Sequence, residues 1–144
     1  MEVLVNKLKN VEDLPRINFY KGNKVFSKSG EYVGKVVNLV FKEHTVKGIV
    51  VRGKALVVLG MDFIDSNSGN VIMLKIDPVT NLIGKFVFDS NGRKLGRVVG
   101  LERNTSGNNY SELVIRKKFY RPTFTVKKTN VAVSRENIIL KNEI

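Results

Sequence analysis

The 144-residue sequence contains no cysteine, tryptophan or glutamine, and His44 is its only histidine. The absence of cysteine excludes disulfide scaffolds, thiolate zinc sites and cysteine nucleophiles. No apolar run approaches the roughly 18 residues of a membrane-spanning helix. The N-terminal residues 1–5 lack the basic and apolar pattern of a signal peptide. We therefore expect a cytoplasmic protein with no membrane span.

Side chains suited to catalysis or metal binding are equally scarce. His44 lies where a hairpin turn is expected, and no partner that would make it a general base is identifiable. The stretch from Asp65 resembles a calcium loop only superficially, because Gly69 and Ile76 occupy positions where that loop needs ligands. We therefore expect no enzymatic activity, no metal, no cofactor and no small-molecule ligand.

The sequence does contain an internal repeat. Residues 22–37 return as residues 84–99 without a gap. The copies share three glycines, a Val-Phe pair, and a cation followed by Val-Val after the last glycine; the two cations are Lys35 and Arg97. Two copies of about 60 residues are too few for a solenoid. The repeat therefore indicates two similar small domains in tandem.

Both copies have the pattern of β-strands, with β-branched residues in short runs separated by turn formers. The strands predicted for the first copy are residues 24–27, 32–40, 47–52, 55–59 and 71–76, with a loop at 65–70. Those of the second copy are 84–88, 95–101, 110–117, 126–133 and 138–141, after a linker at 77–81. We predict an all-β protein of two small antiparallel β-barrels, residues 19–77 and 82–144, preceded by an N-terminal arm of residues 1–18.

Positive charge is abundant and uneven. The formal net charge is +12, and residues 81–144 hold 13 of the 25 cations but only 5 of the 13 acids. Residues 113–135 contain seven cations and no acid. Such a surplus favours a polyanion as partner, either nucleic acid or an anionic membrane surface. The alternative is a solvated surface that only keeps the protein in solution.

Cations alternate with aromatic residues between Arg116 and Phe124. Cations neutralise phosphates, and exposed rings stack on unpaired bases. The alternation of strand side chains favours Phe119 and Phe124 as core residues and leaves Tyr120 as the exposed ring. The predicted nucleic-acid-binding residues are Arg116, Lys117, Lys118, Tyr120, Arg121, Lys127, Lys128 and Arg135, with Arg93, Lys94 and Arg97 extending the surface.

The repeated pattern Gly-x-x-Val-Phe, a turn ending in Gly, and Gly-[Lys/Arg]-Val-Val resembles the opening of a PRC-barrel domain. It occurs at residues 22–37 and again at 84–99. The resemblance implies a small β-barrel that binds macromolecules and performs no chemistry. Family members include the C-terminal barrel of the ribosome-maturation factor RimM, which contacts a small-subunit ribosomal protein, and stand-alone archaeal proteins. Because the matched residues are turn glycines and core valines, no functional residue is carried over.

Two functions remain open from the sequence. The first is a non-enzymatic adaptor that docks on a ribonucleoprotein, the ribosome or its small subunit, through basic contacts to ribosomal RNA and ribosomal protein. The alternative is an archaeal cell-division or structural scaffold that binds protein partners through its barrel edges. The basic second copy favours the first reading, and the apolar run at 55–59 in the first copy favours the second.

Overall fold

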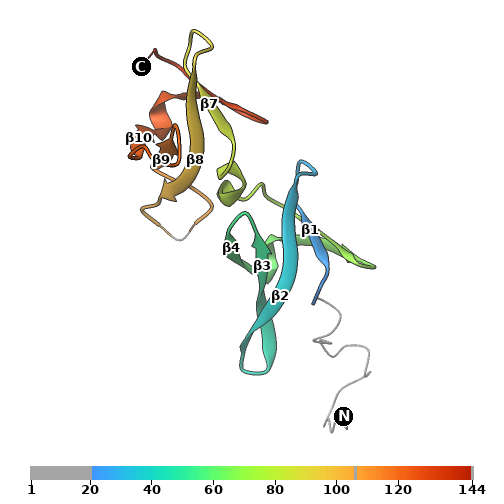
Figure 1. The fold of residues 1–144 in the computed structure, drawn as a ribbon. Helices are drawn as coiled ribbons and strands as arrows, with labels where there is room; N and C mark the ends of the chain where they lie inside the picture. The colour runs from blue at the N-terminus through green and yellow to red at the C-terminus, as the bar shows by residue number, and fades with distance from the viewer. Residues whose placement is uncertain (1–20, 106, 144) are drawn as a thin grey trace, which may run out of the picture. The chain divides into compact units, whose positions relative to one another are not determined.

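The computed structural model describes residues 21–105 and 107–143. The predicted N-terminal arm, residues 1–18, lies outside the described residues. The chain divides into two compact units between Ile76 and Asp77. In the described part of the chain, the regular elements are β-strands and short 3-10 helices (Figure 1).

The first unit is a six-stranded sheet with the order β4-β3-β2-β1-β6-β5. Neighbouring strands are antiparallel except β1 and β6, which run parallel. The hairpin between β2 and β3 turns at Glu43 and His44, whose φ angles are both positive, as a type I′ turn requires. The strands are β1 (Lys24–Phe26), β2 (Tyr32–Lys42), β3 (Thr45–Gly53), β4 (Leu56–Gly60), β5 (Ile64–Ser68) and β6 (Val71–Leu74).

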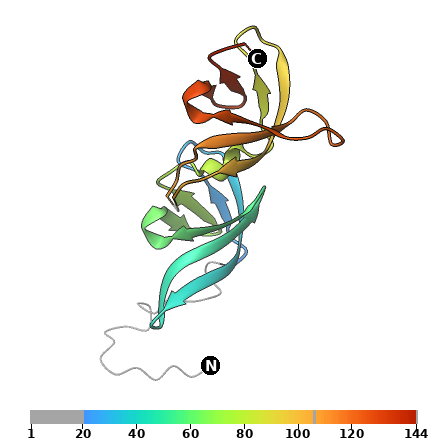
Figure 2. The same cartoon turned by 90° about the vertical axis from the view of Figure 1, so that its left-hand side faces the viewer.

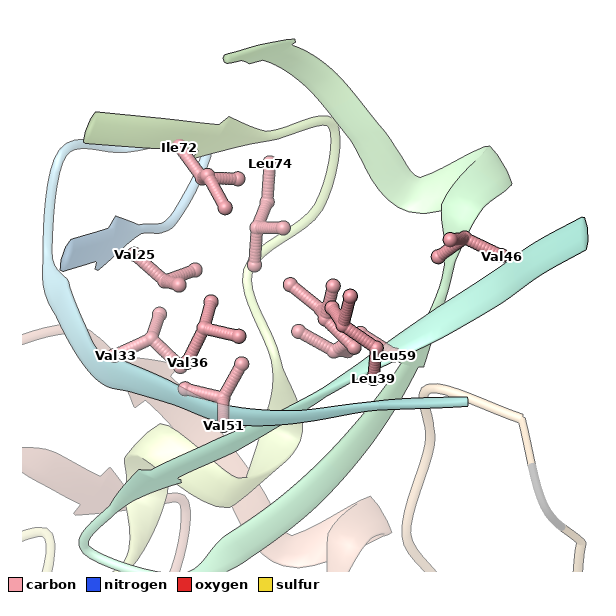
Figure 3. Packing of buried hydrophobic residues seen from close by; sticks show 10 residues of the cluster. Val25, Val33, Val36, Leu39, Val46, Val51, Leu59, Ile72 and Leu74 are labelled. Atoms are coloured by element: carbon pink, nitrogen blue, oxygen red, sulfur yellow. The ribbon is translucent and has the colours of Figure 1, made fainter. Parts of the chain in front are cut away.

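The core of this unit lies inside the curled sheet. Alternate side chains of each strand point inward because successive residues of a strand face opposite sides. Val25 of β1 and Ile72 of β6 face Val36 and Val51 of β2 and β3 across the interior (Figure 3). All four are buried. The repeated valines of the sequence are therefore core residues.

The second unit has the equivalent sheet order, β10-β9-β8-β7-β12-β11, with a parallel pair between β7 and β12. Its separate core includes Val87, Val98, Leu113, Ile115 and Ile138. Its strands are β7 (Phe86–Phe88), β8 (Lys94–Glu102), β9 (Glu112–Arg116), β10 (Phe124–Lys127), β11 (Val131–Ser134) and β12 (Ile138–Leu140). Figure 2 shows the same ribbon turned by 90°. The prediction of two all-β barrel units in tandem is confirmed.

In each unit a three-residue 3-10 turn joins the two edge strands of the sheet. The turn η2 (Met61–Phe63) connects β4 to β5, and η4 (Lys128–Asn130) connects β10 to β11. A connection this short spans opposite edges only if the sheet curls back on itself. The turns therefore explain why each open strand order encloses a core.

A buried polar side chain organises the first turn of each unit. Ser27 Oγ accepts a hydrogen bond from the Glu31 backbone N–H at 3.0 Å. At the equivalent position Asp89 is 1% exposed, and its Oδ1 accepts from the backbone N–H groups of Asn91 and Arg93 at 3.0 and 2.9 Å. These bonds offset part of the cost of burying the two polar side chains, although Asp89 Oδ2 is buried without a hydrogen-bond partner among the described residues.

Two predicted segments were wrong. Residues 65–70 are not a loop, because β5 extends to Ser68 and pairs with β6; an edge strand tolerates polar residues on its solvent side. Residues 126–133 are not one strand, because η4 interrupts them where the chain crosses between the edges. The predicted linker also has structure: Val79–Leu82 is a 3-10 turn, and Leu82 packs on the second core.

Candidate nucleic-acid interface

Three side chains of the second unit lie in a row across its outer face. Phe86 on β7 is the register partner of Arg97 on β8, and Arg97 is the partner of Arg116 on β9. Their neighbours Val87, Val98 and Ile115 are buried in the core. Because strand side chains alternate, Phe86, Arg97 and Arg116 face away from the core. Two arginines therefore lie directly opposite each other beside an aromatic ring.

Gly96 makes the row possible by allowing β8 to lie close to β9. A Cβ atom at Gly96 would be only 2.5 Å from the Arg116 carbonyl oxygen. The φ angle of Gly96 is +150°, which also disfavours other residues. The repeated glycine Gly34 has the same role against Arg52 in the first unit. This glycine of the motif therefore fixes the spacing of the strands that carry the cations.

A long turn between β9 and β10 forms one wall of this face. The first unit joins the equivalent strands with only residues 54–55, whereas the second uses residues 117–123. The Arg121 N–H donates to the Lys118 carbonyl oxygen at 2.9 Å, which closes a β-turn with Phe119 and Tyr120 at its tip. In Figure 2 this orange turn projects away from the sheet of its unit.

The two ring side chains at the tip are open to solvent. Phe119 is 88% exposed and Tyr120 is 61% exposed. Their ring centroids are 5.2 Å apart with the planes at 90°, an edge-to-face contact. The prediction that Phe119 belongs to the core was wrong, because strand alternation stops at Arg116 and the chain then turns. Phe124, in contrast, packs against the second core.

The row and the turn together enclose a groove of about 400 Å³. Phe86, Val99 and Phe119 supply its apolar lining. Among the described residues that line it there are five cations and no carboxylate; the cations are Lys94, Arg97, Arg116, Lys117 and Lys118. The groove is therefore an anion-attracting site with aromatic surface on two sides.

Phe86 positions two of these cations. The Nζ atom of Lys94 lies 3.9 Å from the Phe86 ring centroid, and the Cζ atom of Arg97 lies 4.7 Å from it. Cations over an aromatic face at these distances are attracted by the ring quadrupole. Phe86 thus reduces the freedom of side chains that would otherwise be mobile in solvent. These contacts favour positions of the Lys94 and Arg97 side chains beside the groove in the absence of a ligand.

Arg116 carries an unmet hydrogen-bond donor. Its Nε atom is buried and has no hydrogen-bond partner in the described part of the chain. A buried donor without a partner costs about 1–3 kcal/mol, more for charged groups. Arg116 also lies opposite a second positive charge, Arg97. An anion beside the two guanidinium groups would reduce their mutual repulsion.

The remaining predicted residues lie around this groove or away from it. Tyr120 and Arg121 belong to the same turn, and the Arg121 Cζ atom is 5.7 Å from the Tyr120 ring centroid. Arg93 is in the turn before β8, where its N–H binds Asp89. Lys127 is at the opposite end of β10 from this turn and is the register partner of Glu112. Arg135 precedes β12, where its carbonyl oxygen accepts from Lys85.

Lys128 contacts a different aromatic residue, outside the groove. Its Nζ atom lies 5.1 Å from the ring centroid of Tyr110. Burial raises the pKa of the Tyr110 hydroxyl above its ordinary value of 10.0. Lys128 and Tyr110 therefore form a separate small contact at the other end of β9.

Sequence reasoning missed two residues of the groove, Phe86 and Val99. Phe86 precedes the buried Val87 in the repeated motif, and the equivalent residue of the first copy is Lys24. The available signal was that the two copies differ at this position, next to a core valine that both copies share. The contribution of Phe86 depends on strand pairing with β8, which the sequence alone does not give.

His44 is at the exposed tip of the β2–β3 hairpin, as predicted. In the residues that the structure describes, no group of three or more His, Asp or Glu side chains is placed to hold a metal ion. No helix among the described residues is long and apolar enough to cross a membrane. The absence of enzymatic activity stays a prediction.

The fold and the groove define a small all-β binding module with a basic, aromatic-lined face. The family model of the PRC-barrel domain matches residues 16–79. This match covers most of the first unit, and the second unit repeats the same strand order. A comparison with curated proteins gives no match. A PRC-barrel domain indicates a binding or adaptor role.

Proposed function

We propose that this protein is a non-enzymatic adaptor that docks on a ribonucleoprotein, with the ribosome or its small subunit as the preferred candidate. The basic groove of the second unit contacts RNA phosphates in this proposal. The resemblance to the RimM barrel, which contacts a small-subunit ribosomal protein, motivates the choice of the ribosome and is an analogy of fold.

The observation that supports RNA best is the set of five cations around one groove without a carboxylate among the described lining residues. Like charges directly opposite each other on neighbouring strands are destabilising. Arg97 and Arg116 have this arrangement, and Lys24, Lys35 and Arg52 repeat it in the first unit. A polyanion relieves this repulsion, and a neutral protein surface does not.

The test is a salt series of RNA binding with two matched triple variants. The groove variant replaces Lys94, Arg97 and Arg116 with Gln, and the control variant replaces Lys127, Lys128 and Arg135 with Gln. Both variants lose the same charge. We expect the groove variant to lower the slope of log K against log salt by about 0.7 for each phosphate that these three cations contact on a single strand.

The control variant should lower that slope by less. Equal slopes for the two variants would contradict a localised site and leave only diffuse charge attraction. Binding that does not depend on salt would contradict the phosphate contacts altogether. Sedimentation from the native cell, with and without nuclease treatment, separates the ribosome from other ribonucleoproteins: co-migration with ribosomal subunits is expected and should be lost after nuclease.

One observation favours the scaffold function instead. The edge strand β4 of the first unit exposes Leu56 and Val58, at 62% and 64%, on the same side of the strand. Apolar side chains along an open strand edge are typical of sites that pair with another chain. Replacing both with Ser tests this function. Loss of a co-purifying protein partner, with RNA binding intact, would favour a scaffold.

A further inference from the structure

We infer that the groove and the β-turn of the second unit form a site for one unpaired nucleotide, with the base stacked on Phe119 and its phosphate held by Arg97, Arg116 and Lys94. This inference rests on the proposed function and specifies the form of RNA that is bound. It distinguishes a single strand from a duplex, which phosphate contacts alone do not.

The stacking half of the site is the tip of the turn. Phe119 presents a ring that is 88% exposed, although a side chain of this size is usually buried. Lys118 and Arg121 lie over the neighbouring Tyr120 ring, with Nζ and Cζ at 5.8 and 5.7 Å from its centroid. The Tyr120 face is thus in contact with cations. Its edge-to-face packing on Phe119 holds the pair in place.

The phosphate half is the row on the sheet. Phe86 holds the charged groups of Lys94 and Arg97 over its ring, and Arg116 lies opposite Arg97 on β9. Arg116 and Phe119 line the same groove. Guanidinium groups bind phosphate oxygens in a bidentate manner, and this favours Arg over a point charge. The site therefore combines a planar apolar surface with an ordered anion-binding surface.

The size and shape of the groove favour one nucleotide over a helix. Its volume of about 400 Å³ is at the lower end of the range for small-molecule sites, about 300–1,000 Å³. Bases in a duplex have both faces covered by neighbouring pairs. Single-stranded segments leave those faces free to stack on protein rings. An exposed ring beside a phosphate site therefore fits an unpaired nucleotide.

The first unit supplies an internal comparison. It carries the cationic row Lys24, Lys35 and Arg52 across β1, β2 and β3. Residues 54–55 replace the aromatic turn there. The first unit therefore has the row of cations and lacks the residues equivalent to Phe119 and Tyr120. On this basis only the second unit discriminates between single-stranded and duplex RNA.

The experiment measures fluorescence anisotropy of the full chain with a single-stranded oligoribonucleotide and with a duplex of the same length. We expect Phe119→Ala to weaken single-strand binding about five- to 150-fold and to leave duplex binding unchanged, from the measured range of base stacking on aromatic side chains. Phe119→Tyr keeps the ring and should retain binding. Phe41→Ala removes an exposed ring from the first unit and should have no effect.

A 2-aminopurine base in the single strand provides an independent reading, because its fluorescence is quenched on stacking. Quenching by the wild type and by Phe119→Tyr, with its loss in Phe119→Ala, would support the site. If Phe119→Ala binds single strands normally while the groove triple variant does not, the inference fails and the proposed function stands. If neither RNA form binds and the groove variant changes nothing, both fail.

Discussion

Gly96 shows how one residue without a side chain controls the geometry of the groove. Its missing Cβ leaves room for the Arg116 carbonyl oxygen, so β8 and β9 approach closely enough to oppose two arginines. The repulsion between Arg97 and Arg116 therefore destabilises the same two strands that Gly96 allows to pair closely. Gly96 therefore determines both the pairing of β8 with β9 and the position of the two arginines.

We predict that Gly96→Ala lowers the free energy of unfolding by about 1–3 kcal/mol, because the added methyl group meets backbone that cannot move away and because φ is positive. The measurement is urea unfolding at neutral pH. Gly100→Ala on the same strand is the control, since its Cβ meets only Val114 at an ordinary 3.7 Å. Equal destabilisation by both substitutions would contradict the steric explanation.

Tyr110 gives the second unit a pH dependence in alkaline solution. Its pKa is raised above 10.0 by burial, so the unfolded chain loses this proton at lower pH than the folded chain. The contribution to stability is therefore complete below about pH 10 and is lost as the pH rises through the folded pKa. Tyr110→Phe should unfold with a shallower loss of stability between pH 9 and 11. A loss as steep as that of the wild type would contradict the contribution of Tyr110.

At the scale of elements, β9 takes part in two kinds of charged cross-strand pair. Two residues of like charge lie opposite each other on β8 and β9, and two residues of opposite charge do so on β9 and β10. Arg97 lies opposite Arg116, whereas Lys127 lies opposite Glu112. Cross-strand pairs of these kinds differ in sign, with magnitudes of about 0.2–1 kcal/mol. An anion that binds at the Arg116 end of β9 therefore relieves a repulsion, whereas at the Glu112 end it meets a charge that is already paired.

We predict that Arg116→Gln raises the free energy of unfolding by about 0.2–1 kcal/mol at low salt, while Lys127→Gln lowers it slightly. Thermal unfolding in 50 mM and 500 mM NaCl measures both effects. Salt should reduce the difference, because the Debye length shortens from over 10 Å towards the contact range. A destabilised Arg116→Gln protein would mean that the packing of the arginine stem outweighs its charge.

The sequence predicted those elements whose signal is local. The glycines and valines of the repeat identified two β units and most of their core strands, since turns and alternation depend on neighbouring residues. The parallel pair in each sheet was not predictable, because β1 and β6 are far apart in sequence. The groove was missed for the same reason: Phe86 reaches Arg97 only through strand pairing. Phe119 was misplaced because alternation gives no indication of where a strand ends.

At the scale of the whole molecule, each unit has its own hydrophobic core. Ile49 is fully buried in the first core and Ile115 in the second. The groove residues belong to the second unit alone. Damage to one core should therefore have a local effect on binding.

We predict that Ile49→Ala and Ile115→Ala each cost about 2–5 kcal/mol, the range for large-to-small core substitutions. Hydrogen exchange should show faster exchange over residues 21–76 for Ile49→Ala and over residues 77–143 for Ile115→Ala. RNA binding should persist in the first variant and fail in the second as the temperature rises. Loss of binding at the same temperature in both would show that the units unfold as one.

The parallel pairing of β7 with β12 has a consequence for the time course of folding. Val87 and its partner Ile138 are separated by about 50 residues, and the intervening strands are themselves neighbours in sequence. Contacts of such long sequence separation form late, because the chain loses the entropy of loop closure before these contacts stabilise it. During synthesis, β7, β8 and β9 are made before β12. Until β12 pairs with β7, the core residues of these three strands are covered on one side only. The strands that carry the groove therefore reach their final spacing only after the last strand of the unit has been made.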